Sequence, residues 1–334
     1  MMTETNQSRR TFIKSAAVTG LGVSLGQLTL LGNTVRSGKR VGIIGLDTSH
    51  SIAFAKALNA ASPDPKLKGY RAVAAYPYGS KTIESSFSRI PGYIDEVKKL
   101  GVEVVDSIPA LLSGVDAVLL ETNDGRLHLE QALEVFKAGK PVFIDKPIAA
   151  SLADAQAIFD AAATHGVPVF STSSLRYAEK IAEIRSGALI GPVTGAATYS
   201  PAPIEPTHPD LLWYGIHGIE MLYALLGTGC ERVTRVYSDG TDIVVGTWSD
   251  GRVGTFRGIR SGRTGYGGTA FGEKGQAAIG EYGGYIPLLY QIVDFFDSGI
   301  PPVDSKETLE LVAFIEAADE SRKRGGASVP LWQR

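Results

Sequence analysis

Cysteine, excess charge and long apolar runs are all scarce in this sequence. Its 334 residues include one cysteine, Cys230, so no intrachain disulfide can form and stability must come from a hydrophobic core. The 33 lysines and arginines against 35 aspartates and glutamates give a net charge of −2, which makes nucleic acid and anionic membranes poor partners. Hydrophobic residues make up 44% and charged residues 20%, a composition that excludes a disordered chain and a polytopic membrane protein.

The first 37 residues form a separate segment. Arg9 and Arg10 are followed by Phe12, and an uncharged stretch runs from residue 15 to residue 35. Polar residues interrupt this stretch, so it falls short of the continuous apolar span of about 20 residues that a membrane helix needs. The arginine pair makes the segment resemble a twin-arginine signal, which implies export through the twin-arginine machinery to the periplasm or another extracytoplasmic site. Cleavage near residue 36 and an uncleaved tether both stay open.

Residues 38–170 alternate short apolar runs with longer amphipathic ones. Runs that are apolar throughout and separated by helices are typical of a parallel sheet that is covered on both faces. The expected strands are 41–46, 71–76, 103–105, 117–121, 142–144 and 167–170, with helices that include 126–138 and 152–165. We therefore predict an α/β fold whose first domain is a doubly wound, dinucleotide-binding Rossmann domain.

Residues 171–334 have a different pattern, with strand-like runs close together. Turn pairs such as Asp239-Gly240 and Asp250-Gly251 separate some of these runs and indicate antiparallel hairpins. The expected strands are 193–199, 232–237, 242–248 and 252–260, and the expected helices are 174–186, 211–226 and 305–323. This pattern predicts an α+β domain with a mainly antiparallel sheet, which would bind substrate.

Several segments, in this order and spacing, resemble the glucose–fructose oxidoreductase / inositol dehydrogenase (Gfo/Idh/MocA) family. They are the first strand with its terminal Gly45, the block LHLEQALEVFKAGKPVFIDKP at 127–147, Arg176, the stretch 187–191, and GIHGIE at 215–220. The resemblance spans nearly all of the chain after the signal-like segment. It implies the fold more strongly than the reaction, because the family includes dehydrogenases, glycosidases with a transient redox step, and non-catalytic members.

The loop after the first strand departs from the family's G-x-G-x-x-G pattern. Only Gly45 matches, because Asp47 stands at the second glycine and His50 at the third. The second glycine lets the backbone approach pyrophosphate, and the third allows close packing of helix on strand. In the favoured interpretation, Asp47 or Thr48 caps the helix and its N-terminus still meets phosphate. In the other, the site has lost the dinucleotide and holds a sugar or a metal.

The resemblance implies NAD or NADP as cofactor. The expected contacts lie at the carboxyl ends of the expected strands: Gly45, Leu46, Thr48, Ser49, Tyr76, Thr122, Asn123, Asp145 and Lys146. The second strand ends without a carboxylate that could hold the adenosine ribose, whereas Ser80 and Lys81 could receive a 2′-phosphate. NAD and NADP therefore both stay open.

Lys146, His217 and Glu220 are the candidate catalytic residues. A lysine at the carboxyl end of a parallel strand lies at the ligand crevice, where its ammonium can stabilise a developing alkoxide. The imidazole of His217 suits transfer of a hydroxyl proton near neutral pH, and Glu220 lies on the same helical face and is expected to orient it.

His217 and Glu220 also have the spacing of two metal ligands on one helix, so they form an alternative metal pair. Asp47, His50 or His208 could complete such a site. Arg176, His208 and His217 are expected to contact the substrate. His128 is expected to have a structural role, because a lone histidine usually has its hydrogen bonds satisfied within the fold.

The sequence thus predicts an exported NAD(P)-dependent oxidoreductase that acts on a sugar, a cyclitol or a derivative of one. The alternatives are a non-redox lyase, hydrolase or epimerase on a keto-sugar, and a non-catalytic carbohydrate-binding protein. The expected partners are a carbohydrate-like small molecule and the export machinery, and the resemblance implies a homo-oligomer.

Overall fold

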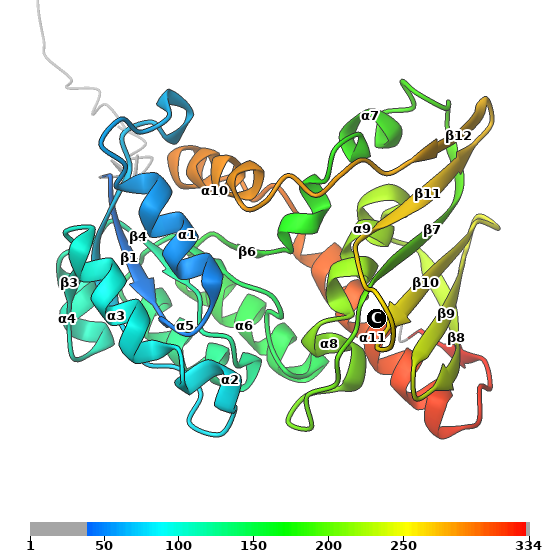
Figure 1. Cartoon of the computed structure of the whole chain (residues 1–334), viewed down its shortest axis with the longest axis horizontal. Coiled ribbons are helices and arrows are strands. Elements are labelled where there is room, and N and C mark those ends of the chain that lie inside the picture. Colours follow the sequence, from blue (N-terminus) through cyan, green and yellow to red (C-terminus); the bar gives the residue numbers. More distant parts are fainter. Residues whose placement is uncertain (1–38, 332–334) are drawn as a thin grey trace, which may run out of the picture. The chain divides into compact units, whose positions relative to one another are not determined.

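A computed structural model describes residues 39–331, so the signal-like segment lies outside the described residues. The first domain holds a six-stranded parallel sheet in the order β3-β2-β1-β4-β5-β6 (Figure 1). Its strands are β1 (Arg40–Ile44), β2 (Arg71–Tyr76), β3 (Glu103–Val104), β4 (Ala117–Leu120), β5 (Val142–Ile144) and β6 (Val169–Ser171). This order confirms the doubly wound fold, with its switch point between β1 and β4. No helix within residues 39–331 is long and apolar enough to span a membrane.

Helices cover both faces of this sheet. They are α1 (Ser49–Leu58), α2 (Glu84–Phe87), α3 (Ile90–Lys99), α4 (Ile108–Ser113), α5 (His128–Lys137) and α6 (Leu152–His165), with short 3-10 turns at Pro65–Leu67 and Gly125–Leu127. The ends of α6 follow the sequence signals, because the Ser151 side chain accepts a hydrogen bond from the amide of Asp154 and Gly166 adopts the left-handed conformation.

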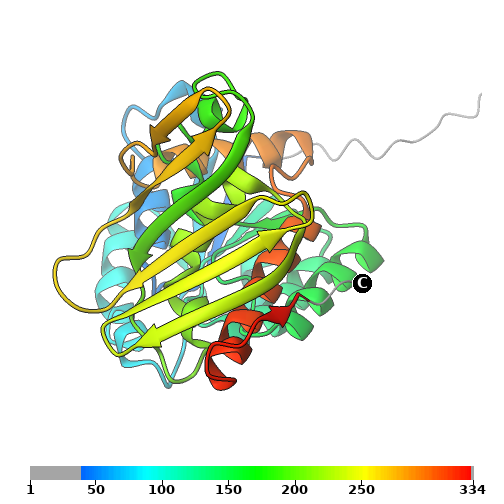
Figure 2. The same cartoon turned by 90° about the vertical axis from the view of Figure 1, so that its right-hand side faces the viewer.

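The second domain holds a seven-stranded sheet in the order β12-β11-β7-β10-β9-β8-β13. Its strands are β7 (Val193–Pro201), β8 (Cys230–Ser238), β9 (Thr241–Trp248), β10 (Val253–Ile259), β11 (Gly267–Gly272), β12 (Gly275–Ala278) and β13 (Val329–Pro330). All neighbours are antiparallel except β7 and β10, which pair in parallel, so the sheet is mixed but mainly antiparallel, as predicted. Figure 2 looks onto the face of this sheet that carries no helix.

Two helices that the sequence predicted as continuous are each broken in two. The stretch 174–186 forms a 3-10 turn (Ser174–Tyr177) and α7 (Ile181–Arg185), separated by Lys180 with a φ of 67°. The stretch 211–226 forms α8 (Asp210–Trp213) and α9 (Ile216–Leu226), which begins after Gly215. Apolar periodicity continues across both breaks, so it could not reveal them. Helix α11 (Ser305–Lys323) follows the prediction.

Helix α10 (Ile286–Ser298) comes from the second half of the chain but packs on the first domain. Its apolar residues, among them Leu288, Ile292 and Phe295, belong to the same buried cluster as Val41 and Phe54 of the first domain. Figure 1 shows α10 next to α1. Helix α10 thus follows strands β7 to β12 of the second sheet in the sequence but covers the first sheet in space.

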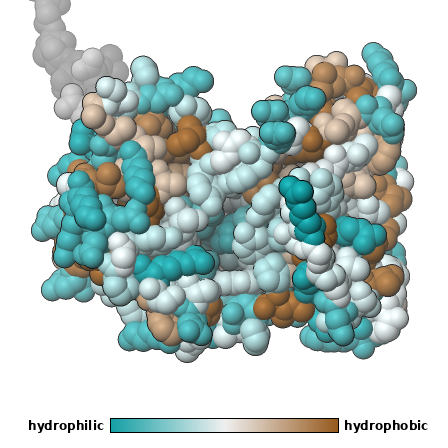
Figure 3. Space-filling view, in the orientation of Figure 1, coloured by the Kyte–Doolittle hydropathy of each residue, from teal (hydrophilic) through white to brown (hydrophobic). Residues whose placement is uncertain are grey.

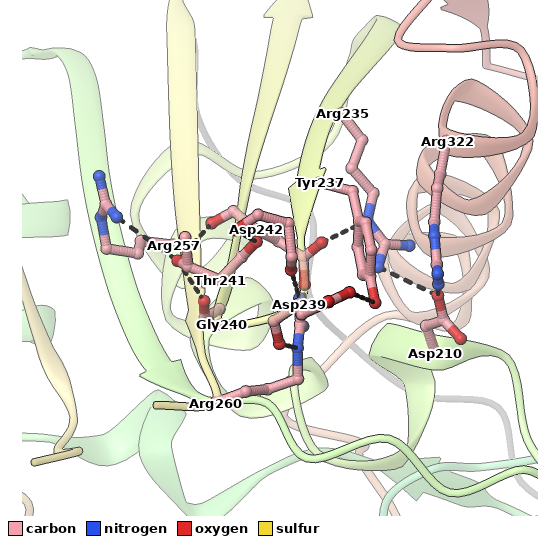
Figure 4. A network of polar contacts seen from close by, with 12 residues as sticks. Asp210, Arg235, Tyr237, Asp239, Gly240, Thr241, Asp242, Arg257, Arg260 and Arg322 are labelled. Atoms are coloured by element: carbon pink, nitrogen blue, oxygen red, sulfur yellow. Dashed lines mark hydrogen bonds and ion pairs between the residues drawn. The ribbon is translucent and has the colours of Figure 1, made fainter. Parts of the chain in front are cut away.

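A buried ion-pair network joins α8 to β8, β9 and α11 (Figure 4). The Arg235 guanidinium is wholly buried and pairs with Asp210, Asp242 and Asp319. Arg322 adds a second pair with Asp210 and lies over the ring of Tyr237. Removal of one member would leave a buried charge without its partner, so the network fixes the position of α8, directly before α9.

Candidate functional site

A cavity of about 260 Å³ lies at the carboxyl ends of the parallel strands, where the two domains meet. The first domain contributes Ser49, His50 and Lys146 to its wall, and the second contributes Tyr214 and His217. Figure 3 shows mostly hydrophilic and neutral side chains on the surface between the two domains. This is the edge at which open α/β sheets bind their ligands.

The β1–α1 loop begins with a glycine in the left-handed region and ends with the cap of α1. Gly45 has a φ of 90°, and a Cβ there would lie 2.4 Å from the backbone nitrogen of Thr122, so only glycine fits. Thr48 caps α1, and its hydroxyl accepts a hydrogen bond of 3.4 Å from the amide of Ser51. Thr48 and Ser49 line the cavity at the N-terminus of α1, which is a favourable position for an anion.

Of the two helix caps that the favoured interpretation offered, the one at Thr48 forms and the one at Asp47 does not. Its carboxylate is buried and accepts hydrogen bonds from the backbone amides of Asn123, at 3.0 Å, and Ser80, at 3.3 Å. Burial raises the pKa of Asp47 to about 6, although these backbone hydrogen bonds act in the opposite direction. Asp47 thus bridges the loops that follow β2 and β4, at the switch point of the sheet.

Further hydrogen bonds tie the same two loops together. The Ser80 hydroxyl donates to Asp124 at 2.8 Å, the Asn123 amide donates to Ser86 at 3.0 Å, and Arg126 donates to Thr82 at 2.7 Å. These bonds close the space beside the end of β2. Tyr76, predicted to contact the cofactor, stacks on Tyr78 at the end of β2, and residues 77–83, which follow it, include no carboxylate.

Lys146 follows β5 and is 6% exposed. Its ammonium lies 5.7 Å from the centroid of the Tyr214 ring and forms no ion pair within residues 39–331. Asn123, Asp145 and Lys146 line the cavity together with Thr48 and Ser49. The other predicted cofactor contacts, Gly45, Leu46, Tyr76 and Thr122, are not part of its wall.

His217 faces Lys146 across the cavity, from α9. Burial, and then the charges of Lys146 and His50, lower the pKa of His217 well below its ordinary value. Its Nδ1 lies 2.6 Å from the hydroxyl of Ser173. When Nδ1 donates this hydrogen bond, the lone pair of Nε2 is free to accept a proton from a ligand. Ser173, which the sequence did not single out, is therefore the orienting partner.

Glu220 does not orient His217 and is not placed as a metal ligand, in contrast to both expectations. Its carboxylate pairs with Arg176 at 2.6 Å and accepts a hydrogen bond from Thr172 at 2.5 Å. Arg176 also pairs with Glu307. Neither Arg176 nor Glu220 lines the cavity. This buried ion-pair cluster is therefore not placed to contact a ligand in the cavity.

The remaining histidines of the sequence prediction have structural contacts. His208 Nε2 accepts a hydrogen bond of 3.2 Å from the amide of Gly125, and burial lowers the pKa of His208 to about 4. His208 does not line the cavity, so it is not placed to contact the substrate there. His128 lies within hydrogen-bond distance of the carbonyl oxygens of Thr122 and Ile148, which is the structural role expected for it.

Four tyrosines line the cavity on the side of the second domain, and none of them belongs to a recognised sequence motif. They are Tyr214, Tyr266, Tyr282 and Tyr285. The hydroxyls of Tyr214 and Tyr266 are 3.0 Å apart, and that of Tyr285 lies 3.1 Å from Ser49. Aromatic rings with polar tips suit a ligand that presents both C–H faces and hydroxyls.

A cluster of three buried polar residues, His50, Asp145 and Glu121, lies at the cavity, with His50 and Asp145 in its wall and Glu121 outside it. His50 Nδ1 lies 2.9 Å from an Asp145 oxygen and 3.9 Å from a Glu121 oxygen. Burial, reinforced by the charge of Asp145, raises the pKa of Glu121 well above its ordinary value. Burial acts in the same direction on Asp145, but the charges of His50 and Lys146 outweigh it and hold the pKa of Asp145 below its ordinary value.

Residues 39–173 match a family model, GFO_IDH_MocA, described as an oxidoreductase family with the NAD-binding Rossmann fold. No curated protein matches the chain. Solved structures with the same fold include myo-inositol 2-dehydrogenase from Lactobacillus plantarum, at a TM-score of 0.72 and 17% identity over 88% of this chain and 99% of that one.

Two further structures are myo-inositol dehydrogenases. The one from Lactobacillus casei, in complex with NAD(H) and myo-inositol, has a TM-score of 0.69 and 17% identity over 88% of this chain and 97% of that one. The one from Corynebacterium glutamicum has a TM-score of 0.71 and 16% identity over 88% of this chain and 99% of that one. At these identities the likeness extends to the fold.

Proposed function

From the match of residues 39–173 to the family model of oxidoreductases with the NAD-binding Rossmann fold, we propose that the protein is an NAD(P)-dependent oxidoreductase of a sugar, a cyclitol or a derivative. One observation carries the proposal: Lys146 and His217, from different domains, line the same cavity. The tyrosine wall supports a polyhydroxylated ligand, and a similarly folded protein was crystallised with NAD(H) and myo-inositol.

The cavity side of the first domain fits one part of a dinucleotide. The amides and hydroxyls at the start of α1 would hold a phosphate, and Asn123 and Lys146, which line the same cavity, would hold the nicotinamide ribose. The rest of the dinucleotide would meet Asp47 at the switch point between β1 and β4. The carboxylate of Asp47 has the same sign of charge as phosphate. The bound nicotinamide would supply hydride transfer at a substrate carbon.

In this proposal the chain's own residues move the hydroxyl proton. His217 Nε2 accepts the proton as the alcohol is oxidised and returns it in the reverse direction, with Ser173 holding the ring through Nδ1. The Lys146 ammonium donates a hydrogen bond to the same oxygen and stabilises its developing negative charge. Burial on both sides excludes bulk water from this exchange.

Turnover of purified protein with NAD and with NADP, over a panel of sugars and cyclitols, tests the proposal. We expect reduced cofactor to form with at least one polyol and Lys146→Met to abolish its formation. A protein that binds neither nucleotide in calorimetry would refute it.

A non-redox reaction on a keto-sugar is the second candidate. It is favoured by the carboxylate of Asp47 at the position where the family pattern has a glycine. Conversion of a keto-sugar without any change in nicotinamide absorbance would support it.

Export through the twin-arginine route is proposed from Arg9, Arg10 and Phe12. Replacement of both arginines by lysine is expected to retain the protein in the cytoplasm, because the receptor distinguishes the guanidinium pair from two ammonium groups. Unchanged export of this variant would contradict the proposal.

A further inference from the structure

His50, Glu121 and Asp145 converge on one point beside the cavity, whose wall includes His50 and Asp145. They stand at the start of α1, directly after β4 and directly after β5, and β1, β4 and β5 are neighbours in the sheet. The carboxyl ends of neighbouring parallel strands share one edge, so the topology brings the three side chains together. One nitrogen and two carboxylate oxygens lie within 4.8 Å of one another.

The polar atoms that meet there have no hydrogen-bond partners. Both oxygens of Glu121, both oxygens of Asp145 and Nδ1 of His50 are buried without one in the described part of the chain. The two carboxylates are 0% exposed and His50 is 7% exposed. A buried carboxylate without hydrogen bonds costs several kcal/mol of folding free energy, on the order of the stability of a domain, unless a cation compensates it.

The charges of His50 and Lys146 supply only part of that compensation. Within residues 39–331, Lys146 forms no ion pair with Glu121 or Asp145, and the approach of His50 to Asp145 lacks hydrogen-bond geometry. Asp47, a buried carboxylate in the same crevice, shows the contrast, because two backbone amides donate to it. Unlike Asp47, the side chains of His50, Glu121 and Asp145 have buried polar atoms that accept or donate no hydrogen bond.

We propose that His50, Glu121 and Asp145 bind a divalent transition-metal ion, with Zn²⁺ and Mn²⁺ as the ions that suit this ligand set. One imidazole nitrogen and two carboxylates are ligands that both ions accept, and their two negative charges match a dication. Three protein ligands leave coordination positions open. His50 and Asp145 line the same cavity as Lys146 and His217, so a hydroxyl or keto oxygen of a ligand in that cavity would have access to the ion.

This site gives a reason for the departures in the loop after β1. His50 stands where the family pattern has the third glycine, and a glycine there could contribute no ligand. The site differs from the pair that the sequence suggested, since His217 and Glu220 are not among its ligands. It does not depend on nucleotide binding, so its test is separate from that of the proposed oxidoreductase activity.

Metal content and metal affinity test the proposal. Full-length protein, purified without chelator, is expected to contain about one transition-metal ion per chain by inductively coupled plasma mass spectrometry. After removal of metal by a chelator, Zn²⁺ or Mn²⁺ is expected to bind with a stoichiometry of one in calorimetry and to raise the melting temperature. If the stripped wild-type protein binds neither ion, the proposal is wrong.

Variants locate the site. Glu121→Gln and Asp145→Asn are expected to weaken metal binding at least tenfold each, and His50→Gln provides a third test that leaves both carboxylates in place. Asp47→Asn is the matched control, because it removes a buried carboxylate from the same crevice and is expected to leave metal affinity within about twofold. Circular dichroism of the metal-free variants checks that each one folds. Metal binding that is unchanged in all three variants would overturn the assignment.

Discussion

The carboxylate of Asp47 accepts a 3.0 Å hydrogen bond from the backbone amide of Asn123, across the switch point between β1 and β4. Asp47→Asn keeps an acceptor there but removes the charge that repels phosphate. We expect it to tighten NAD or NADP binding about fivefold at pH 8, equivalent to about 1 kcal/mol. Calorimetric titration of both proteins measures this difference.

The same difference should vanish in acid. The pKa of Asp47 in the folded protein is about 6, so the wild-type carboxyl is mostly neutral at pH 5 and already resembles the asparagine. Nucleotide affinities of wild type and variant should therefore converge at pH 5. An advantage of the variant that is equal at pH 5 and pH 8 would contradict this electrostatic explanation.

Lys146→Met should lower kcat at least a hundredfold with little change in melting temperature. The ammonium stabilises negative charge in the transition state, whereas its methylene groups, which methionine replaces, provide the packing. Steady-state kinetics and thermal unfolding of the two proteins give the two quantities. Lys137→Met, an exposed lysine of α5, is the control and should leave both unchanged. A Lys146→Met enzyme with near wild-type kcat would rule out the role given to this ammonium.

His217→Gln should reduce kcat by about 10²- to 10⁴-fold, the usual contribution of a general base. Because the pKa of His217 is lowered, activity of the wild type should persist below pH 6, where an ordinary histidine is protonated. Ser173→Ala should shift this acid limb and lower kcat while leaving KM nearly constant. A pH–rate profile that Ser173→Ala does not change would show that Ser173 does not position the ring.

His208 should make the fold sensitive to acid. Its pKa is about 4 in the folded protein against 6.5 for an ordinary histidine, so the unfolded state binds the proton more tightly. The stability that this group contributes is full above pH 6.5 and is lost as pH falls through 4, by up to about 2 kcal/mol. His208→Gln should lose less stability between pH 7 and pH 4 in urea unfolding. His165→Gln, an exposed histidine, should follow the wild type.

Gly45→Ala should destabilise the protein by about 2 kcal/mol or more, because strain at a φ of 90° adds to a 2.4 Å contact with Thr122. Gly69→Ala isolates the strain, because its φ of 79° is similar but its Cβ would meet open space. That variant should lose only about 1 kcal/mol. Urea unfolding measures both losses, and equal losses would show that the close contact is unimportant.

The two sheets could be predicted from the sequence, because the spacing of apolar residues within each strand is a local property of the chain. The sequence also placed Lys146 and His217 at one site, through a resemblance whose motifs lie on those elements. It misassigned Asp47 and Glu220, because capping chemistry and helical spacing do not reveal which distant group a carboxylate meets. The partners that these two residues have, Asn123 and Arg176, lie 76 and 44 residues away and are set by packing. The break before α9 was hidden by apolar residues on both sides.

The position of α10 has a consequence for how the chain folds as it is made. Sheet strands of the first domain are complete once residue 171 has been synthesised, but the apolar surface that Leu288, Ile292 and Phe295 cover stays bare until α10 leaves the ribosome. Domains usually fold in the order of their synthesis, yet here the first must wait for a helix from the second half. A fragment that stops at residue 173 would therefore be incomplete and prone to aggregation, even though the family pattern ends there.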